Sequence, residues 1–309
     1  MNHGAASAPR VESTLRRLEL DVFRRLDGLL QGDHLGLVPA PGTEAGESRE
    51  YQVGDDVRRM DWAVTARTLV PHVRDTIADR ELETWIVVDR SASLDFGTAK
   101  FEKRDLALAM VAAVGFLTSR SGNRVGALVL GNDRTFFVPA RAGREAMLAL
   151  LHQVDSVPRP DVARPPAGDL RAALRTTAKL ARRRGLIVVV SDFLTSAEWQ
   201  PALRALAVRH DVLAVEILDP RENELPPVGL VTLVDTETGR RVEVQTASEK
   251  VRARFAEAAT RQREAIASDI RGAGAEHVVL RTDRDWLLDL AKYVSARKRR
   301  RAARVAPAR

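Results

Sequence analysis

The chain has 309 residues, 45% hydrophobic and 29% charged, which fits one large domain with appendages or two small ones and argues against a disordered protein. It contains no cysteine, which excludes disulfides, thiolate metal sites and cysteine nucleophiles. Much of the net charge of +7 comes from residues 297–309, a basic tail that we expect to be solvated. We therefore do not expect nucleic-acid binding to be the main function.

No segment predicts a membrane anchor or an export signal. The longest apolar run, residues 106–117, is shorter than the ~20 residues that a spanning helix needs. The first residues lack the apolar core of a signal peptide. We expect a cytoplasmic protein without a transmembrane segment.

The first 80 residues predict two appendages. Residues 11–30 place leucines at helical spacing, which predicts an amphipathic helix. A turn-rich linker, residues 39–50, leads into a dense polar segment at 49–67. The predicted organisation is an N-terminal tail and helix at 1–35, a polar segment at 36–80, a main domain at 81–295 and a basic tail at 296–309.

From Trp85 the chain alternates strands with helices. Strands are expected at 85–88, 125–130, 134–138, 186–190, 212–218 and 277–280, with helices at 100–120, 144–154, 170–184, 198–209, 248–271 and 285–299. Residues 229–234 and 240–245 flank a turn and predict an inserted β-hairpin. The alternation predicts an α/β fold with a doubly wound, mostly parallel sheet.

Two aspartates directly follow buried strands of this sheet. Asp89 and Asp192 are expected near each other, because ligands of such sheets bind at the carboxyl ends of strands. Ser91 and Ser93 follow Asp89 at alternate positions, and such hard oxygen ligands suit Mg²⁺ or Mn²⁺. In the alternative interpretation, Asp89 caps the next turn and the serines satisfy local backbone amides.

The triplet Asp89, Ser91 and Ser93 resembles the D-x-S-x-S motif of the metal-ion-dependent adhesion site in von Willebrand factor A domains. Asp192 matches the later aspartate of that family. The resemblance implies an ion bound by these four residues. Gly168 stands where the family has a threonine ligand, which predicts weaker binding unless Asp169 substitutes for it.

The polar segment carries the pattern R-x-Y-x-x-G-D-D-x-R-x-x-D-W-x-x-x-A-R. It resembles the signature of the bacterial domain-of-unknown-function 58 family, with the matching residues Tyr51, Gly54, Asp55, Asp56, Arg58, Asp61, Trp62, Ala66 and Arg67. The resemblance implies a von Willebrand A-like fold and an adaptor or assembly factor that works with a MoxR-type AAA+ ATPase on a client protein.

The same segment can also be interpreted from its residues alone. Gly54 permits a tight turn, the acids can pair with the arginines in charge-assisted bonds, and Trp62 is expected to anchor the segment by burying its ring. A structural network and a binding surface explain these residues equally well, and both interpretations stay open.

These observations predict a non-enzymatic, metal-dependent protein-interaction module, in which the open coordination position of the ion accepts a carboxylate from a partner. The alternatives are a metal-dependent phosphodiester hydrolase using Asp89, Asp169 and Asp192, or a nucleic-acid-binding protein. A third possibility is a decayed ion site, with partners bound through the polar segment. The chain contains neither a G-x-S-x-G elbow nor a phosphate-binding G-x-x-x-x-G-K-[ST] loop.

Overall fold

A computed structural model of the chain describes residues 48–52, 55, 57, 60–74, 83–99, 101–119, 123–131, 134–159, 169–195, 198–235 and 240–305. Several sequence predictions lie outside these residues. They are the helix at 11–30, most of the linker, and the positions Gly54, Asp56, Arg58 and Gly168.

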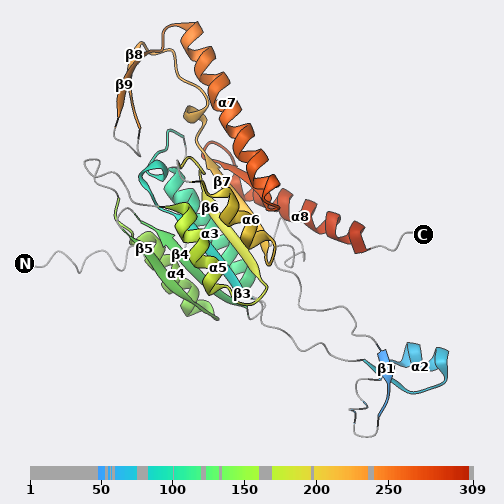
Figure 1. The fold of residues 1–309 in the computed structure, drawn as a ribbon. Helices are drawn as coiled ribbons and strands as arrows, with labels where there is room; N and C mark the ends of the chain where they lie inside the picture. The colour runs from blue at the N-terminus through green and yellow to red at the C-terminus, as the bar shows by residue number, and fades with distance from the viewer. Residues whose placement is uncertain are drawn as a thin grey trace, which may run out of the picture.

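A six-stranded sheet forms the centre of the molecule (Figure 1). Its strands are β3 (Glu83–Asp89), β4 (Arg124–Leu130), β5 (Thr135–Arg141), β6 (Leu186–Ser191), β7 (Asp211–Leu218) and β10 (Glu276–Arg281). The strand order is β10-β7-β6-β3-β4-β5, and only β5 runs antiparallel, as the hairpin partner of β4. The predicted doubly wound, mostly parallel sheet is confirmed.

The central strands are apolar along their length because helices cover both faces of the sheet. Alternate side chains point to opposite faces, so Ile86 and Val88 enter one core cluster while Trp85 and Val87 enter the other. All six residues of β6 are buried. This double burial is why the sequence of these strands reads as a continuous apolar run.

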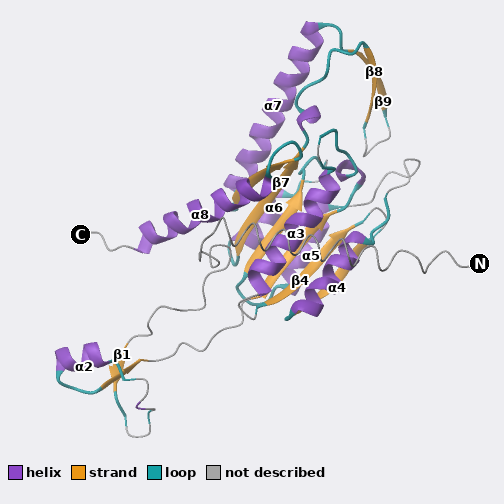
Figure 2. Cartoon of the chain, turned by 180° about the vertical axis from the view of Figure 1, so that it is seen from behind, coloured by secondary structure: helices purple, strands orange, loops and turns teal. Residues whose placement is uncertain are grey.

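The flanking helices divide between the two faces (Figure 2). The helices are α3 (Lys103–Ser119), α4 (Arg144–Asp155), α5 (Leu170–Leu180), α6 (Gln200–Ala207), α7 (Glu249–Gly272) and α8 (Trp286–Val305). The apolar sides of α3, α4 and α8 join the first core cluster, and those of α5, α6 and α7 join the second. Each helix predicted after Trp85 is present, although α5 ends four residues before the predicted 184.

The direction of winding reverses between β3 and β6. From β3 the chain proceeds outward through β4 to β5, then returns to β6 on the other side of β3 and proceeds to β7 and β10. Strands β3 and β6 are parallel neighbours, with Val88 opposite Val190. The carboxyl ends of the two strands at such a reversal are the usual ligand position in doubly wound sheets.

The polar segment forms a small unit of β1 (Ser48–Glu50), α2 (Trp62–Thr68) and β2 (His72–Arg74), with β1 and β2 antiparallel. The expectation that Trp62 anchors it is wrong, because this side chain is 70% exposed. Asp61 provides the anchor instead. Its buried carboxylate accepts hydrogen bonds from Ser48 Oγ at 2.7 Å and from the first backbone N–H groups of α2, as an N-cap.

The predicted hairpin is also present, as β8 (Leu230–Val234) and β9 (Arg241–Gln245). The last helix continues to Val305, beyond its predicted end at 299 and into the predicted basic tail, and Arg297 is not a solvated tail residue. Its guanidinium is buried and pairs with Glu276 at 2.7 Å. Among the residues that the structure describes, no helix combines the length and apolarity needed to span a membrane.

Candidate functional site

The adjacent carboxyl ends of β3 and β6 bring the predicted ligands together. Asp89 is the last residue of β3, and Asp192 directly follows β6. Ser91 and Ser93 lie in the turn after β3, with their hydroxyl oxygens 3.2 Å apart. Asp89 and Asp192 stand at the carboxyl ends of adjacent parallel strands, and the charge of Asp192 raises the pKa of Asp89. Four hard oxygen side chains thus meet at the reversal point of the sheet.

Two hydrogen bonds orient the buried carboxylate of Asp89. Its Oδ1 accepts the backbone N–H of Ser91 at 2.9 Å, and its Oδ2 accepts the hydroxyl of Ser191 at 2.8 Å. Burial and the neighbouring charge of Asp192 raise the pKa of Asp89. No ion pair to Asp89 occurs within the part of the chain that the structure describes. The capping interpretation is therefore correct for the Ser91 amide, and the buried carboxylate is held by hydrogen bonds without an ion pair to any described residue.

Asp192 is held in a different environment. Its Oδ2 lies 2.8 Å from Nζ of Lys103, and its Oδ1 accepts the backbone N–H of Leu194 at 3.1 Å. Burial alone would raise the pKa of Asp192, but the charge and hydrogen bond of Lys103 outweigh burial and lower it. Asp192 therefore remains ionised beside Asp89.

The chain turns sharply after Asp192. Phe193 has φ 57°, a left-handed conformation that is strained for a bulky residue. Two contacts hold it there: its N–H donates to Ser191 Oγ at 3.0 Å, and its ring packs on Trp199 with the centroids 5.1 Å apart. The hydroxyl of Ser191 accepts the N–H of Phe193, next to Asp192, and donates to the carboxylate of Asp89. The turn therefore links the positions of Asp89 and Asp192.

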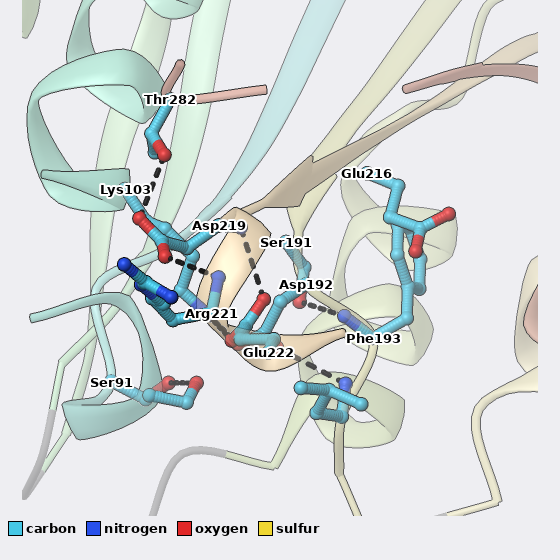
Figure 3. A network of polar contacts seen from close by, with 12 residues as sticks. Ser91, Lys103, Ser191, Asp192, Phe193, Glu216, Asp219, Arg221, Glu222 and Thr282 are labelled. Carbon is cyan, nitrogen blue, oxygen red and sulfur yellow. Dashed lines mark hydrogen bonds and ion pairs between the residues drawn. The ribbon is translucent and has the colours of Figure 1, made fainter. Parts of the chain in front are cut away.

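Lys103 begins α3 and has no exposed surface. Its ammonium group lies between Asp192 and Glu222, and both carboxylates raise its pKa although burial would lower it (Figure 3). Arg263 of α7 continues the network, with Nη2 at 3.0 Å from Glu222 and Nη1 at 2.9 Å from Glu216. Sequence analysis missed this network, since only the folded chain brings α3, α7 and β7 together.

The carboxylate of Asp219 connects the loops around the site. Asp219 is fully buried and caps the short 3₁₀ helix η3 (Pro220–Glu222) through the N–H of Arg221. It also accepts the hydroxyl of Thr98 at 2.6 Å. A third contact comes from the hydroxyl of Thr282 at 2.7 Å (Figure 3). The loops after β3, β7 and β10 are thereby tied to one carboxylate, which keeps Glu222 in reach of Lys103.

Asp169 does not join the site. Its carboxylate caps α5 by accepting the N–H of Ala172 at 3.1 Å. Among the described residues, no three His, Cys, Asp or Glu side chains are grouped closely enough to share an ion. The suggestion that Asp169 replaces the missing threonine ligand is therefore not supported.

The four residues nevertheless fit a small divalent cation. Mg²⁺ contacts oxygens at about 2.1 Å, so a single ion can reach two hydroxyls that are 3.2 Å apart. Within the described part of the chain, the buried carboxylate of Asp89 has no cationic partner and stands on the strand next to that of Asp192, an arrangement that a bound cation would stabilise. Ser91, Ser93, Asp89 and Asp192 supply only oxygen donors, which selects Mg²⁺ or Mn²⁺ over softer metals.

Comparison with known proteins places the chain in a family. The model of the family described as "Protein of unknown function DUF58" matches residues 47–265. The chain belongs to the DUF58 family. The uncharacterized protein Rv1480 of Mycobacterium tuberculosis is 53% identical over 301 residues, which cover 97% of this DUF58 chain and 93% of the relative. An uncharacterized Mycobacterium avium protein is 45% identical over 162 residues, covering 52% and 94% of the two chains.

Solved structures are similar to this DUF58 protein at lower identity. The conserved hypothetical protein BatB from Bacteroides thetaiotaomicron is 16% identical with a TM-score of 0.45, covering 72% of this chain and 99% of its own. The SpRpn10 VWA domain is 14% identical with a TM-score of 0.37, covering 69% and 95%. The fold assignment therefore rests on the strand order and register described above.

Proposed function

We propose that this DUF58 protein is a non-enzymatic protein-interaction module that binds Mg²⁺ or Mn²⁺ through Asp89, Ser91, Ser93 and Asp192. The observation that carries the proposal is the meeting of four oxygen-bearing side chains at the reversal point of the sheet, among them the buried carboxylate of Asp89, which forms no ion pair with any residue that the structure describes. A buried charge of this kind is costly unless a cation or another ligand accompanies it.

When bound, the ion would offer an open coordination position to a carboxylate from a partner protein. The residues of the chain prepare this position. Ser191 orients Asp89, and Lys103 keeps Asp192 ionised while fixing one of its oxygens. Asp192 Oδ2 retains a further lone pair, since each carboxylate oxygen can accept two contacts.

The proposed partners are a MoxR-type AAA+ ATPase and a client protein that it remodels, in the cytoplasm. Family membership and the resemblance of Asp89, Ser91 and Ser93 to the adhesion motif support this part of the proposal. The exposed surface of the signature segment around Trp62 offers a second contact region for the same ATPase.

The test measures binding of the purified MoxR-type ATPase from the same genome to the full chain, by calorimetry, in Mg²⁺ and in EDTA. We expect binding in Mg²⁺, its loss in EDTA, and its loss in Asp89→Asn even with Mg²⁺. Asp169→Asn is the matched control and should bind like the wild type, because Asp169 only caps α5.

Two outcomes would overturn parts of this proposal. Equal binding in Mg²⁺ and EDTA would retain the adaptor role and reject the ion bridge. Absence of ATPase binding, together with Mn²⁺-dependent cleavage of a phosphodiester that Asp192→Ala abolishes, would identify a hydrolase instead.

A further inference from the structure

The β8–β9 hairpin forms a separate two-stranded sheet. Figures 1 and 2 show it standing away from the central sheet, on the side where α7 begins. Within the described part of the chain, neither β8 nor β9 has a second strand beside it. An isolated two-stranded sheet is only marginally stable in water, so additional pairing would stabilise the hairpin.

The register shows which backbone groups of β8 point away from β9. Thr246 donates its N–H to the carbonyl of Gly229 at 2.7 Å, and Asp235 donates to Arg240 at 2.9 Å. Hydrogen-bonded pairs alternate with non-hydrogen-bonded pairs in an antiparallel ladder. Leu230, Thr232 and Val234 therefore occupy the non-hydrogen-bonded positions, and their N–H and C=O groups are directed outward along the free edge of β8.

The two edges of the hairpin differ in charge. Strand β9 carries Arg241 and Glu243, side chains of the kind that protect exposed edges from pairing. Strand β8 has the sequence LVTLV, without a charge, a proline or a glycine. Two apolar residues of this strand are also exposed, Leu230 by 63% and Val234 by 44%. An uncharged, exposed strand edge is a template for another strand.

The strand β8 is also complementary to itself. In an antiparallel pair of β8 strands centred on Thr232, Leu230 faces Val234 of the other copy, Val231 faces Leu233, and Thr232 faces Thr232. Apolar and threonine pairs of this kind stabilise a ladder. The same pairing of two β9 strands would place Glu243 directly opposite Glu243, which is repulsive.

We propose that two copies of this chain associate through their β8 strands, forming an antiparallel sheet in the order β9-β8-β8-β9 about a two-fold axis at Thr232. The outward backbone groups of Leu230, Thr232 and Val234 satisfy one another across the axis. One face of the hairpin carries Val231, Leu233, Val242 and Val244, so the new sheet has a continuous apolar face of branched side chains from both copies. This interface is independent of the ion site.

Proline substitutions at paired positions of the hairpin test the interface. Thr232 and Glu243 face each other, and the N–H group of each points away from the partner strand. Thr232→Pro removes a donor from the β8 edge, and Glu243→Pro removes one from the β9 edge, while neither removes a hydrogen bond within the hairpin. Sedimentation velocity of the full chain over a concentration series gives the mass of each variant.

We expect the wild type and Glu243→Pro to reach twice the monomer mass of 34.0 kDa at high concentration, and Thr232→Pro to stay monomeric. Circular dichroism and unfolding curves establish that each variant is folded. A wild type that remains monomeric throughout would overturn the proposal. A dimer that persists in Thr232→Pro but dissociates in Glu243→Pro would also overturn it, by assigning the contact to β9.

A cross-link provides a second test, because the chain contains no cysteine. The Cα atoms of a hydrogen-bonded antiparallel pair lie about 5.5 Å apart, within the range that a disulfide bridges. Under mild oxidation we expect Thr232→Cys to form a covalent dimer at least ten times faster than Glu243→Cys. Equal rates for the two variants, or no covalent dimer of Thr232→Cys, would contradict the two-fold axis at Thr232.

Discussion

The ammonium group of Lys103 lies 2.8 Å from the carboxylate of Asp192, and both side chains are almost completely buried. The pair connects the start of α3 with the end of β6, 89 residues later in the chain. It fixes the charge and the direction of Asp192, one of the four candidate ligands, before any ion or partner arrives. Lys103 is thus a positioning residue for the site.

Removing the ammonium should destabilise the fold strongly. Lys103→Met leaves Asp192 and Glu222 as buried carboxylates without this partner, a change that typically costs about 3–5 kcal/mol. Urea unfolding would measure the loss. Arg261→Gln is the control, since it breaks an exposed ion pair with Glu257 and should change the free energy of unfolding by less than about 1 kcal/mol. Equal effects of the two substitutions would contradict the role assigned to Lys103.

Binding of Mg²⁺ should stabilise the folded chain. A ligand present at 100 times its dissociation constant adds about 2.7 kcal/mol to the free energy of unfolding. We expect thermal unfolding to shift upward with Mg²⁺ in the wild type and in Asp169→Asn, whose altered residue only caps α5. Asp89→Asn should lose the shift. If Asp89→Asn responds to Mg²⁺ like the wild type, the ion does not bind at this carboxylate.

The stability contributed by Asp219 should depend on pH. Burial would raise the pKa of Asp219, but hydrogen bonds from Thr98, Arg221 and Thr282 outweigh it and lower the pKa below the ordinary 3.8. A carboxylate with a lowered folded-state pKa stabilises the fold above its unfolded pKa, and this contribution disappears as the pH falls through the folded value. We therefore expect Asp219→Asn to be less stable than the wild type at pH 7.

The same comparison at acid pH is the critical measurement. The difference in free energy of unfolding between wild type and Asp219→Asn should remain constant from pH 7 to about pH 5 and shrink only below pH 4. A difference that is the same at pH 7 and pH 3 would indicate that hydrogen-bond geometry, and not the charge of Asp219, carries its effect.

Trp62 should matter for binding and not for folding. Because its ring is 70% exposed, Trp62→Ser should change the free energy of unfolding by less than about 0.5 kcal/mol. We expect the same substitution to weaken binding of the ATPase at least tenfold in calorimetry, since exposed tryptophans often dominate interfaces. Unchanged affinity would restrict the partner surface to the ion site.

Asp61→Ala tests the stability of the same segment. It removes the N-cap of α2 and should cost about 1 kcal/mol locally. Hydrogen exchange of the α2 amides measures this loss. Protection equal to that of the wild type would mean that Asp61 does not stabilise the helix.

Most of the fold could be predicted from the sequence, because strand and helix patterns are local. The buried run of β6, the helical spacing of α3 and the hairpin turn each depend on neighbouring residues alone. Parallel strands share one carboxyl edge, so the ends that carry Asp89 and Asp192 were predicted to lie at the same edge of the sheet. The sequence by itself therefore determined the mostly parallel sheet, the shared edge of Asp89 and Asp192, and the four candidate ligands.

Only the tertiary structure decided which partners those ligands have. Lys103, Glu222 and Arg263 come from three separate elements, and nothing in their local sequence indicates that they meet. The exposure of Trp62 and the capping role of Asp169 depend equally on what the folded chain places around them. Periodicity predicts which face of a helix or strand is buried. The exposure of a single side chain, its ion pairs and its pKa depend on distances between segments that only packing brings together.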